Sequence, residues 1–284
     1  MSIGFVAFIV GNSQVGLYSP SGKCQYTITP LPPSPIGIAY LTMSLLNKQV
    51  LASGGTNNKN CYIYDVATDK WSIYSTSNVF HTDMRGVVHQ GKVYLTDNTK
   101  PEVFDPVTKT WSTWTAPPFS GGCACFVSWK NVIFRFGPGN GNYRQVLQYD
   151  PTTKIWTTLT PSNPPMDLCY SGCAVLPNMN VLLAGSVTGS INKMFAVFNV
   201  TSNTWPLTTN ATVNLYHSKV LVMGSRVFII PHYDYSTVIE YNYFDNTASN
   251  MSTLLNLPRP FFAGAIAAPA VWFSHLPDGC IGVY

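Results

Sequence analysis

Histidine is the first residue type to consider for catalysis, because it acts as a base, an acid or a metal ligand near neutral pH. The five histidines are His81, His89, His217, His232 and His275, and none has the spacing of a metal ligand. No ordered set of serine, histidine and aspartate and no nucleophile elbow is present either. We therefore expect no bound metal, no cofactor and no catalytic residue, so that enzymatic activity is not favoured.

Paired carboxylates are equally scarce. The chain has only 12 acidic residues, and Asp65, Asp105, Asp150 and Asp245 each follow an aromatic residue in a repeated pattern typical of turns. A hydrolase that works with two carboxylates is therefore poorly supplied.

A glycine-rich stretch, "GPGNGN" at 137–142, superficially resembles a dinucleotide-binding loop. That motif needs a helix after it, and the sequence that follows, "YRQVLQYD", has the character of a strand. We interpret the stretch as a hairpin loop.

Cysteine chemistry is the remaining candidate. The count of seven is odd, so at least one thiol has no partner within the chain. The closest spacings, Cys123-x-Cys125 and Cys169-x₃-Cys173, match no common zinc pattern. We expect strand cysteines, with one or two disulfides among them.

Composition excludes two classes of partner. Charged residues make up 10% of the chain and the net charge is +4, with lysine and arginine scattered singly. Nucleic-acid binding normally requires a clustered basic surface, so we expect none. No apolar stretch is long enough to span a bilayer, and the opening "GFVAFIVG" lacks the flanks of a signal peptide, so we expect a strand there and no membrane insertion.

The elements that must position any site follow from a repeat. Six times, an aromatic residue is followed by a turn-forming residue, and a bulky residue stands seven positions after the aromatic. The aromatics are 40 to 49 residues apart, a period typical of propellers and solenoids. The six copies are Tyr18 to Gln25, Tyr64 to Trp71, Phe104 to Trp111, Tyr149 to Trp156, Phe198 to Trp205 and Phe244 to Met251.

Each repeat unit reads as four short strands. An apolar run precedes the aromatic, a Thr/Ser-rich run follows the bulky position, and Pro-rich loops lead to a strand of small apolar residues. One such sheet cannot bury both its faces, so the units must stack radially. We expect the tryptophans to pack on neighbouring blades.

This pattern resembles the kelch repeat family over nearly the whole chain, although only Gly54-Gly55 keeps the family's glycine doublet in full. The resemblance implies one domain over 1–284, an all-β, six-bladed propeller of four-stranded blades. It also implies that the C-terminal strand, within 261–273, completes the first blade, with 274–284 as a tail beyond it.

Binding is expected on the face that carries the loops between second and third strands and between consecutive blades, because function tends to lie on loops of a rigid scaffold. Aromatic and arginine side chains are the usual centres of interfaces. The candidates are Phe80, His81, Arg85, Tyr143, Arg144, His232, Tyr233, Tyr235 and Arg259.

The same topology predicts a disulfide between Cys24 and Cys280. Cys24 lies in the third-to-fourth turn of the first blade, and the segment after the closing strand should emerge on the same face. Direct pairing of Cys169 with Cys173 is the rival, and two free thiols at 24 and 280 are the other alternative.

Three N-glycosylation sequons, at Asn199, Asn210 and Asn250, together with sparse charge and the cysteine count, favour an extracellular protein. We expect a non-catalytic module that binds a protein or a glycan. Two alternatives stay open: a sugar-active propeller such as a sialic-acid mutarotase, for which Arg85 and Arg259 are the candidate arginines, and an intracellular kelch substrate adaptor.

Overall fold

The structure is a computed structural model of the chain, and the secondary structure that it describes consists of strands joined by turns and loops. It describes residues 5–11, 14–18, 25–28, 41–46, 49–54, 59–68, 70–80, 85–96, 100–119, 123–139, 142–160, 164–185, 193–231, 237–251 and 262–269.

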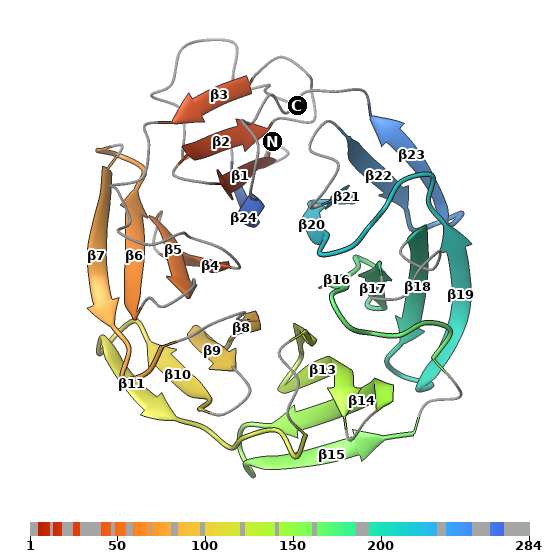
Figure 1. The fold of residues 1–284 in the computed structure, drawn as a ribbon, viewed down its shortest axis with the longest axis horizontal. Helices are drawn as coiled ribbons and strands as arrows, with labels where there is room; N and C mark the ends of the chain where they lie inside the picture. The colour runs from red at the N-terminus through yellow and green to blue at the C-terminus, as the bar shows by residue number, and fades with distance from the viewer. Residues whose placement is uncertain are drawn as a thin grey trace.

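The described strands form six four-stranded antiparallel sheets, which we number as blades in chain order. Figure 1 shows them arranged in a ring. The strands nearest the centre include β24, β4, β8, β16 and β20, and the strands at the outer edge are β3, β7, β11, β15, β19 and β23. An all-β propeller of four-stranded blades, as predicted, is confirmed.

Five blades each consist of four consecutive strands. Blade 2 has β4 (Leu41–Leu46), β5 (Gln49–Gly54), β6 (Asn60–Asp65) and β7 (Lys70–Thr76). Blade 3 has β8 (Arg85–His89), β9 (Lys92–Thr96), β10 (Glu102–Asp105) and β11 (Thr110–Thr113). Blade 4 has β12 (Cys125–Trp129), β13 (Val132–Gly139), β14 (Asn142–Asp150) and β15 (Ile155–Leu159). Blade 5 has β16 (Gly172–Val175), β17 (Val181–Ala184), β18 (Met194–Asn199) and β19 (Thr204–Asn210). Blade 6 has β20 (Lys219–Met223), β21 (Arg226–Ile230), β22 (Val238–Asn242) and β23 (Thr247–Met251).

Blade 1 joins the two ends of the chain. Its order is β24 (Phe262–Pro269), β1 (Phe5–Gly11), β2 (Gln14–Tyr18) and β3 (Gln25–Ile28). The register of β24 on β1 runs from Phe5 opposite Pro269 to Gly11 opposite Phe262. The predicted completion of the first blade by a C-terminal strand is therefore confirmed.

The repeated aromatic and the bulky residue seven positions later are cross-strand neighbours. Tyr64 lies opposite Trp71, Phe104 opposite Trp111 and Tyr149 opposite Trp156. Between them the Asp or Asn side chain closes the turn by accepting backbone N–H groups: Asp150 Oδ1 accepts from Thr152 at 2.8 Å. The turn chemistry expected from the sequence is thus the device that sets the register of the two outer strands.

In blade 6 the predicted repeat register is wrong by three residues. The pairing places Tyr241 opposite Ala248, not Phe244 opposite Met251. Asn242 is the turn residue, because its Oδ1 accepts the amide of Phe244 at 3.0 Å. Phe244 itself is 80% exposed at the turn instead of lying in the core.

The blade tryptophans bridge neighbouring blades, as expected. Trp111 of blade 3 donates through Nε1 to Ser75 Oγ of blade 2 at 2.9 Å. Trp156 of blade 4 donates to the carbonyl of Thr115, which follows blade 3, at 2.9 Å. Trp71 is buried, whereas Trp111, Trp156 and Trp205 are half-buried.

The core lies between the blades. One cluster joins Leu182, Phe195 and Val197 of blade 5 to Val227 and Tyr241 of blade 6. Another joins the phenylalanines of blade 4 to Val181 and Phe198 of blade 5. At these two junctions, blades 4, 5 and 6 therefore pack face to face, which fixes their strands relative to one another.

Candidate interaction site on the loop face

Two faces of the ring differ in what they carry. Because the strands alternate in direction, connections between second and third strands and between consecutive blades lie at one end of the blades, here called the loop face. The turns between first and second and between third and fourth strands lie at the other end, here called the turn face.

The described part of the loop face contains Phe80, Tyr143 and Arg144 of the predicted binding set. Arg85 opens β8, where only its backbone is described. His81, His232, Tyr233, Tyr235 and Arg259 lie outside the described residues.

Phe80 is 54% exposed, with the Lys59 ammonium 4.8 Å from its ring centroid. The same ammonium donates to the carbonyl of Asn78 at 2.8 Å. Phe80 is thus accessible, and its nearest charged neighbour is tied to the same loop.

Arg144 holds a loop of its own chain. Its Nε donates to Asp167 Oδ1 at 3.0 Å and its Nη1 to the carbonyl of Pro164 at 3.2 Å. The Leu168 amide donates to the carbonyl of Tyr143 at 2.8 Å. Arg144 therefore fixes the segment that enters blade 5, while the ring of Tyr143 stays 47% exposed above it.

At the entry to the inner strands, a relay of backbone hydrogen bonds links blades 4, 5 and 6. The Tyr170 amide donates to the carbonyl of Cys123, and the His217 amide donates to the carbonyl of Tyr170, both at 2.9 Å. The strand registers show that these three residues occupy equivalent positions, each two residues before the start of the paired inner strand.

Tyr170, Tyr216 and His217 form one aromatic cluster on this relay. The His217 ring lies 4.1 Å from the Tyr170 ring and 4.3 Å from the Tyr216 ring, centroid to centroid. Both tyrosines are half-buried, and His217 is buried. Tyr170 and His217 have φ values of 57° and 56°, in the left-handed region that non-glycine residues rarely adopt.

Two disulfides join blades 4 and 5 beside this aromatic cluster, and we call the cluster and these disulfides the rim of the loop face. Cys123 pairs with Cys169, with their Cα atoms 4.9 Å apart, and Cys125 pairs with Cys173, with their Cα atoms 6.1 Å apart. The predicted rival, Cys169 with Cys173, is therefore wrong, since these two cysteines each bond to blade 4 instead. Cys24 and Cys280 lie outside the described residues, so their pairing stays a prediction.

The remaining described thiol is inert. Cys61 is buried, and burial raises its pKa far above the ordinary range, so the reactive thiolate is disfavoured. Among the described residues, no group of three or more His, Cys, Asp or Glu side chains could hold a metal ion.

Arg135 is a buried cation that the sequence did not point to. It is 1% exposed, and its Nη1 donates to the carbonyl of Pro138 at 2.7 Å. Burial lowers its pKa to about 10. It holds the end of β13 from within the fold, so it supports the loop face and is not part of its exposed surface.

The aromatic cluster could have been found from one signal in the sequence. Tyr170-Ser171 and His217-Ser218 stand at equivalent places before two inner strands, and both serines are buried. An aromatic followed by a buried serine at the same repeat position indicates a residue held at the rim.

Comparisons with known proteins agree with this architecture. No family model matches the chain. A protein of Arabidopsis thaliana whose name describes an F-box/kelch-repeat protein is 22% identical over 56% of this chain and 44% of its own length. The solved structure of YjhT shares the fold with a TM-score of 0.52 at 16% identity, over 62% of this chain and 66% of that one. The chain thus spans less than half the length of that curated relative.

The blades define a β-propeller, and the repeat together with these likenesses supports a divergent kelch-type propeller. Within the described ranges, no helix has the length and apolar character needed to cross a membrane.

Proposed function

We propose that this propeller is a non-catalytic interaction module that binds a protein partner through its loop face. The carrying observation is the aromatic cluster of Tyr170, Tyr216 and His217, fixed between blades by backbone hydrogen bonds and disulfides. The exposed Tyr143 projects from the strand whose backbone binds the same entry loop.

The chemistry of these residues suits a protein interface. Tyrosine buries a large apolar ring, keeps a hydroxyl for hydrogen bonding and loses little side-chain entropy on binding. A rim already ordered before the partner arrives lowers the entropic cost of association. The disulfides and the Arg144–Asp167 ion pair each hold the segment that enters blade 5 against blade 4 before a partner binds.

Affinity purification with quantitative mass spectrometry, from cells that make the protein, tests this proposal. The variant Tyr143→Ala/Tyr216→Ala should lower recovery of specific partners by about tenfold, the equivalent of losing about 1.4 kcal/mol. The matched control is Val107→Ala/Ile155→Ala, which removes two exposed apolar residues near the turn face. Equal recovery with both variants contradicts the proposed face.

We propose in addition that residues 1–284 act as one closed six-bladed domain. The pairing of β24 with β1 supports this, because it makes the stability of blade 1 depend on both ends of the chain. Deleting 262–284 should convert one cooperative unfolding transition into an early transition followed by a later one. An unchanged single transition in calorimetry argues against closure as a stabilising device.

An extracellular location is the setting we favour. Disulfides persist in oxidising compartments and are rare in the cytosol, and the structure has two in the rim of blades 4 and 5. The sequons at Asn210 and Asn250 carry exposed side chains, and that at Asn199 is half-buried in its turn. A mass loss on enzymatic deglycosylation of the natural protein supports this location.

A second candidate, an intracellular substrate adaptor, is favoured by the name of the Arabidopsis relative. The extracellular module and the intracellular adaptor differ in whether the four rim cysteines are oxidised to disulfides. Alkylation of the natural protein without reduction should leave Cys123, Cys125, Cys169 and Cys173 unmodified for an extracellular module. Full alkylation of these four favours the adaptor. The sugar-active role stays the third alternative, tested by turnover of sialic-acid anomers.

A further inference from the structure

We propose that blade 6 carries a binding site for a neutral saccharide on its turn face, separate from the protein-binding rim. A pocket of about 420 Å³ lies there, within the range of small-molecule sites. Its lining includes Arg226, Glu240, Asn242, Tyr243 and Phe244. The inference does not rest on the proposed function, because it concerns the opposite end of the blade.

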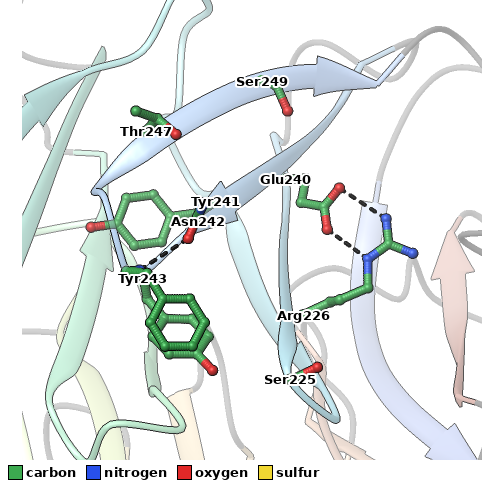
Figure 2. Close-up of a pocket in the computed structure, with 9 residues that line it drawn as sticks. Ser225, Arg226, Glu240, Tyr241, Asn242, Tyr243, Thr247 and Ser249 are labelled. Carbon is green, nitrogen blue, oxygen red and sulfur yellow. Dashed lines mark hydrogen bonds and ion pairs between the residues drawn. The ribbon is translucent and has the colours of Figure 1, made fainter.

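An ion pair between Arg226 and Glu240 lines the pocket. Arg226 Nε and Nη2 donate to Glu240 Oε1 and Oε2 at 2.6 and 2.8 Å, and Figure 2 shows the two side chains directed at each other from β21 and β22. In the strand register, Glu240 takes the position that Val197 occupies in blade 5, Val103 in blade 3 and Gln148 in blade 4. Blade 6 therefore places a charged group at a position that is apolar in blades 3 and 5, and this group lines the pocket.

The pair is held ready for a ligand. The guanidinium carbon of Arg226 lies 4.7 Å from the centroid of the Phe228 ring, which supports it from beneath. The side chains of Arg226 and Glu240 remain 41% and 28% exposed. Fixed, accessible donors and acceptors side by side match the paired hydroxyls of a sugar, each of which both donates and accepts.

Two aromatic rings complete the site. The ring centroids of Tyr243 and Phe244 lie 4.3 Å apart, and Phe244 is 80% exposed, so its ring is accessible to a ligand. The partial positive C–H groups of a sugar ring pack on the negative face of an aromatic ring. Because Arg226 and Glu240 neutralise each other and the other described lining residues are uncharged, a neutral saccharide is favoured over an acidic one.

Titration of the purified protein with maltotriose, cellotriose and chitotriose, followed by ligand-observed NMR, tests the proposal. At least one should bind with a Kd of about 1 mM or tighter. Phe244→Ala and Glu240→Gln should each weaken that binding by about tenfold, while Phe244→Tyr should restore it. The matched control is Val107→Ala, since Val107 holds the same turn position in blade 3 and is 88% exposed.

Three results overturn the site: no binding by any of the three saccharides, binding that both variants leave unchanged, or binding restricted to an acidic probe such as sialyllactose. Equal thermal midpoints of wild type and Phe244→Ala show that the comparison concerns folded protein. Partner recovery through Tyr143 and Tyr216 should be the same in these variants, so failure of one proposal is distinguishable from failure of the other.

Discussion

The amide of His217 donates to the carbonyl of Tyr170 across the junction of blades 5 and 6, and both residues have left-handed backbone. That conformation costs a non-glycine residue about 1 kcal/mol or more, and it persists only where the surroundings determine it. Here the ring contacts among Tyr170, Tyr216 and His217 and the nearby disulfides do so. The strain lies at the residues that we place at the centre of the interface.

The two rim disulfides should stabilise the fold non-additively. Each closes a loop of similar length, with sequence separations of 46 and 48, so either one alone supplies most of the constraint on the unfolded chain. Loop-closure entropy predicts that Cys125→Ser/Cys173→Ser lowers the free energy of unfolding by about 2 kcal/mol, and that removing both bonds lowers it by about 6 kcal/mol. Urea denaturation measures both, with Cys61→Ala as the control without a disulfide. A loss for the quadruple variant no greater than twice the single-bond loss contradicts this account.

Replacing the blade tryptophan Trp156 should destabilise the protein through the junction of blades 3 and 4. Trp156 contacts Trp114 and Tyr149, with ring centroids 5.6 and 4.9 Å apart. Trp156→Ala should cost about 3 kcal/mol, and Trp156→Phe, which loses mainly the bond to Thr115, about 1 kcal/mol. Ile155→Ala is the neighbouring control, because Ile155 is 59% exposed. Chemical denaturation that finds Trp156→Ala and Ile155→Ala alike refutes the packing role.

Substituting alanine for Gly185 or for Gly91 compares two costs of an added Cβ: overlap with a neighbouring residue and an unfavourable backbone conformation. Both have positive φ values, 89° and 76°. A Cβ on Gly185 would overlap the carbonyl of Leu215, whereas a Cβ on Gly91 meets nothing within 4 Å. Gly91→Ala should therefore cost about 1 kcal/mol, and Gly185→Ala clearly more, about 3 kcal/mol. Similar losses of thermal stability for the two variants would count against the close packing of blades 5 and 6 at this point.

The turn aspartates should make stability fall in acid. The Asp150 carboxylate accepts the amides of Thr152 and Thr153, and these bonds hold its pKa below the ordinary value. A depressed folded-state pKa gives stability that is present above the unfolded pKa, about 3.9, and is lost as the pH falls through the folded value. Asp150→Asn should remove this dependence and keep the turn, as Asn199 does in blade 5. Carboxyl NMR that places the Asp150 pKa at or above about 3.9 contradicts it.

Much of the architecture could be predicted from the sequence because a seven-residue offset and a turn-forming Asp or Asn are local signals. The blade 6 register could not, because Tyr241-Asn242 and Phe244-Asp245 are both an aromatic followed by a turn-forming residue. The bulky residue seven positions later follows Phe244, at Met251, whereas Tyr241 has Ala248 there, so the pattern favoured the wrong pair. The pocket beside Phe244 depends on that register and was missed with it.

The sequence spacing of the paired cysteines matches the repeat period. Cys123 and Cys169, and likewise Cys125 and Cys173, are separated by about one repeat period, so the blade stacking brings them together. By contrast, the left-handed backbone at Tyr170 and His217 depends on contacts between blades that no local pattern encodes. Of the predicted loop residues, Arg144 proved to be committed to Asp167 and Pro164, because a long side chain beside a Pro-rich loop finds local partners.

The most direct test of the central claim is site-specific photo-crosslinking in cells that make the protein. A benzophenone amino acid replaces Tyr143 on the loop face or, in a separate variant, Val107 on the turn face, both exposed in the free protein. We predict that the crosslinker at 143 captures a defined protein partner and that adding Tyr216→Ala weakens the capture, while the crosslinker at 107 does not capture that partner. Capture of the same partner from 107 and not from 143 would contradict binding through the loop face.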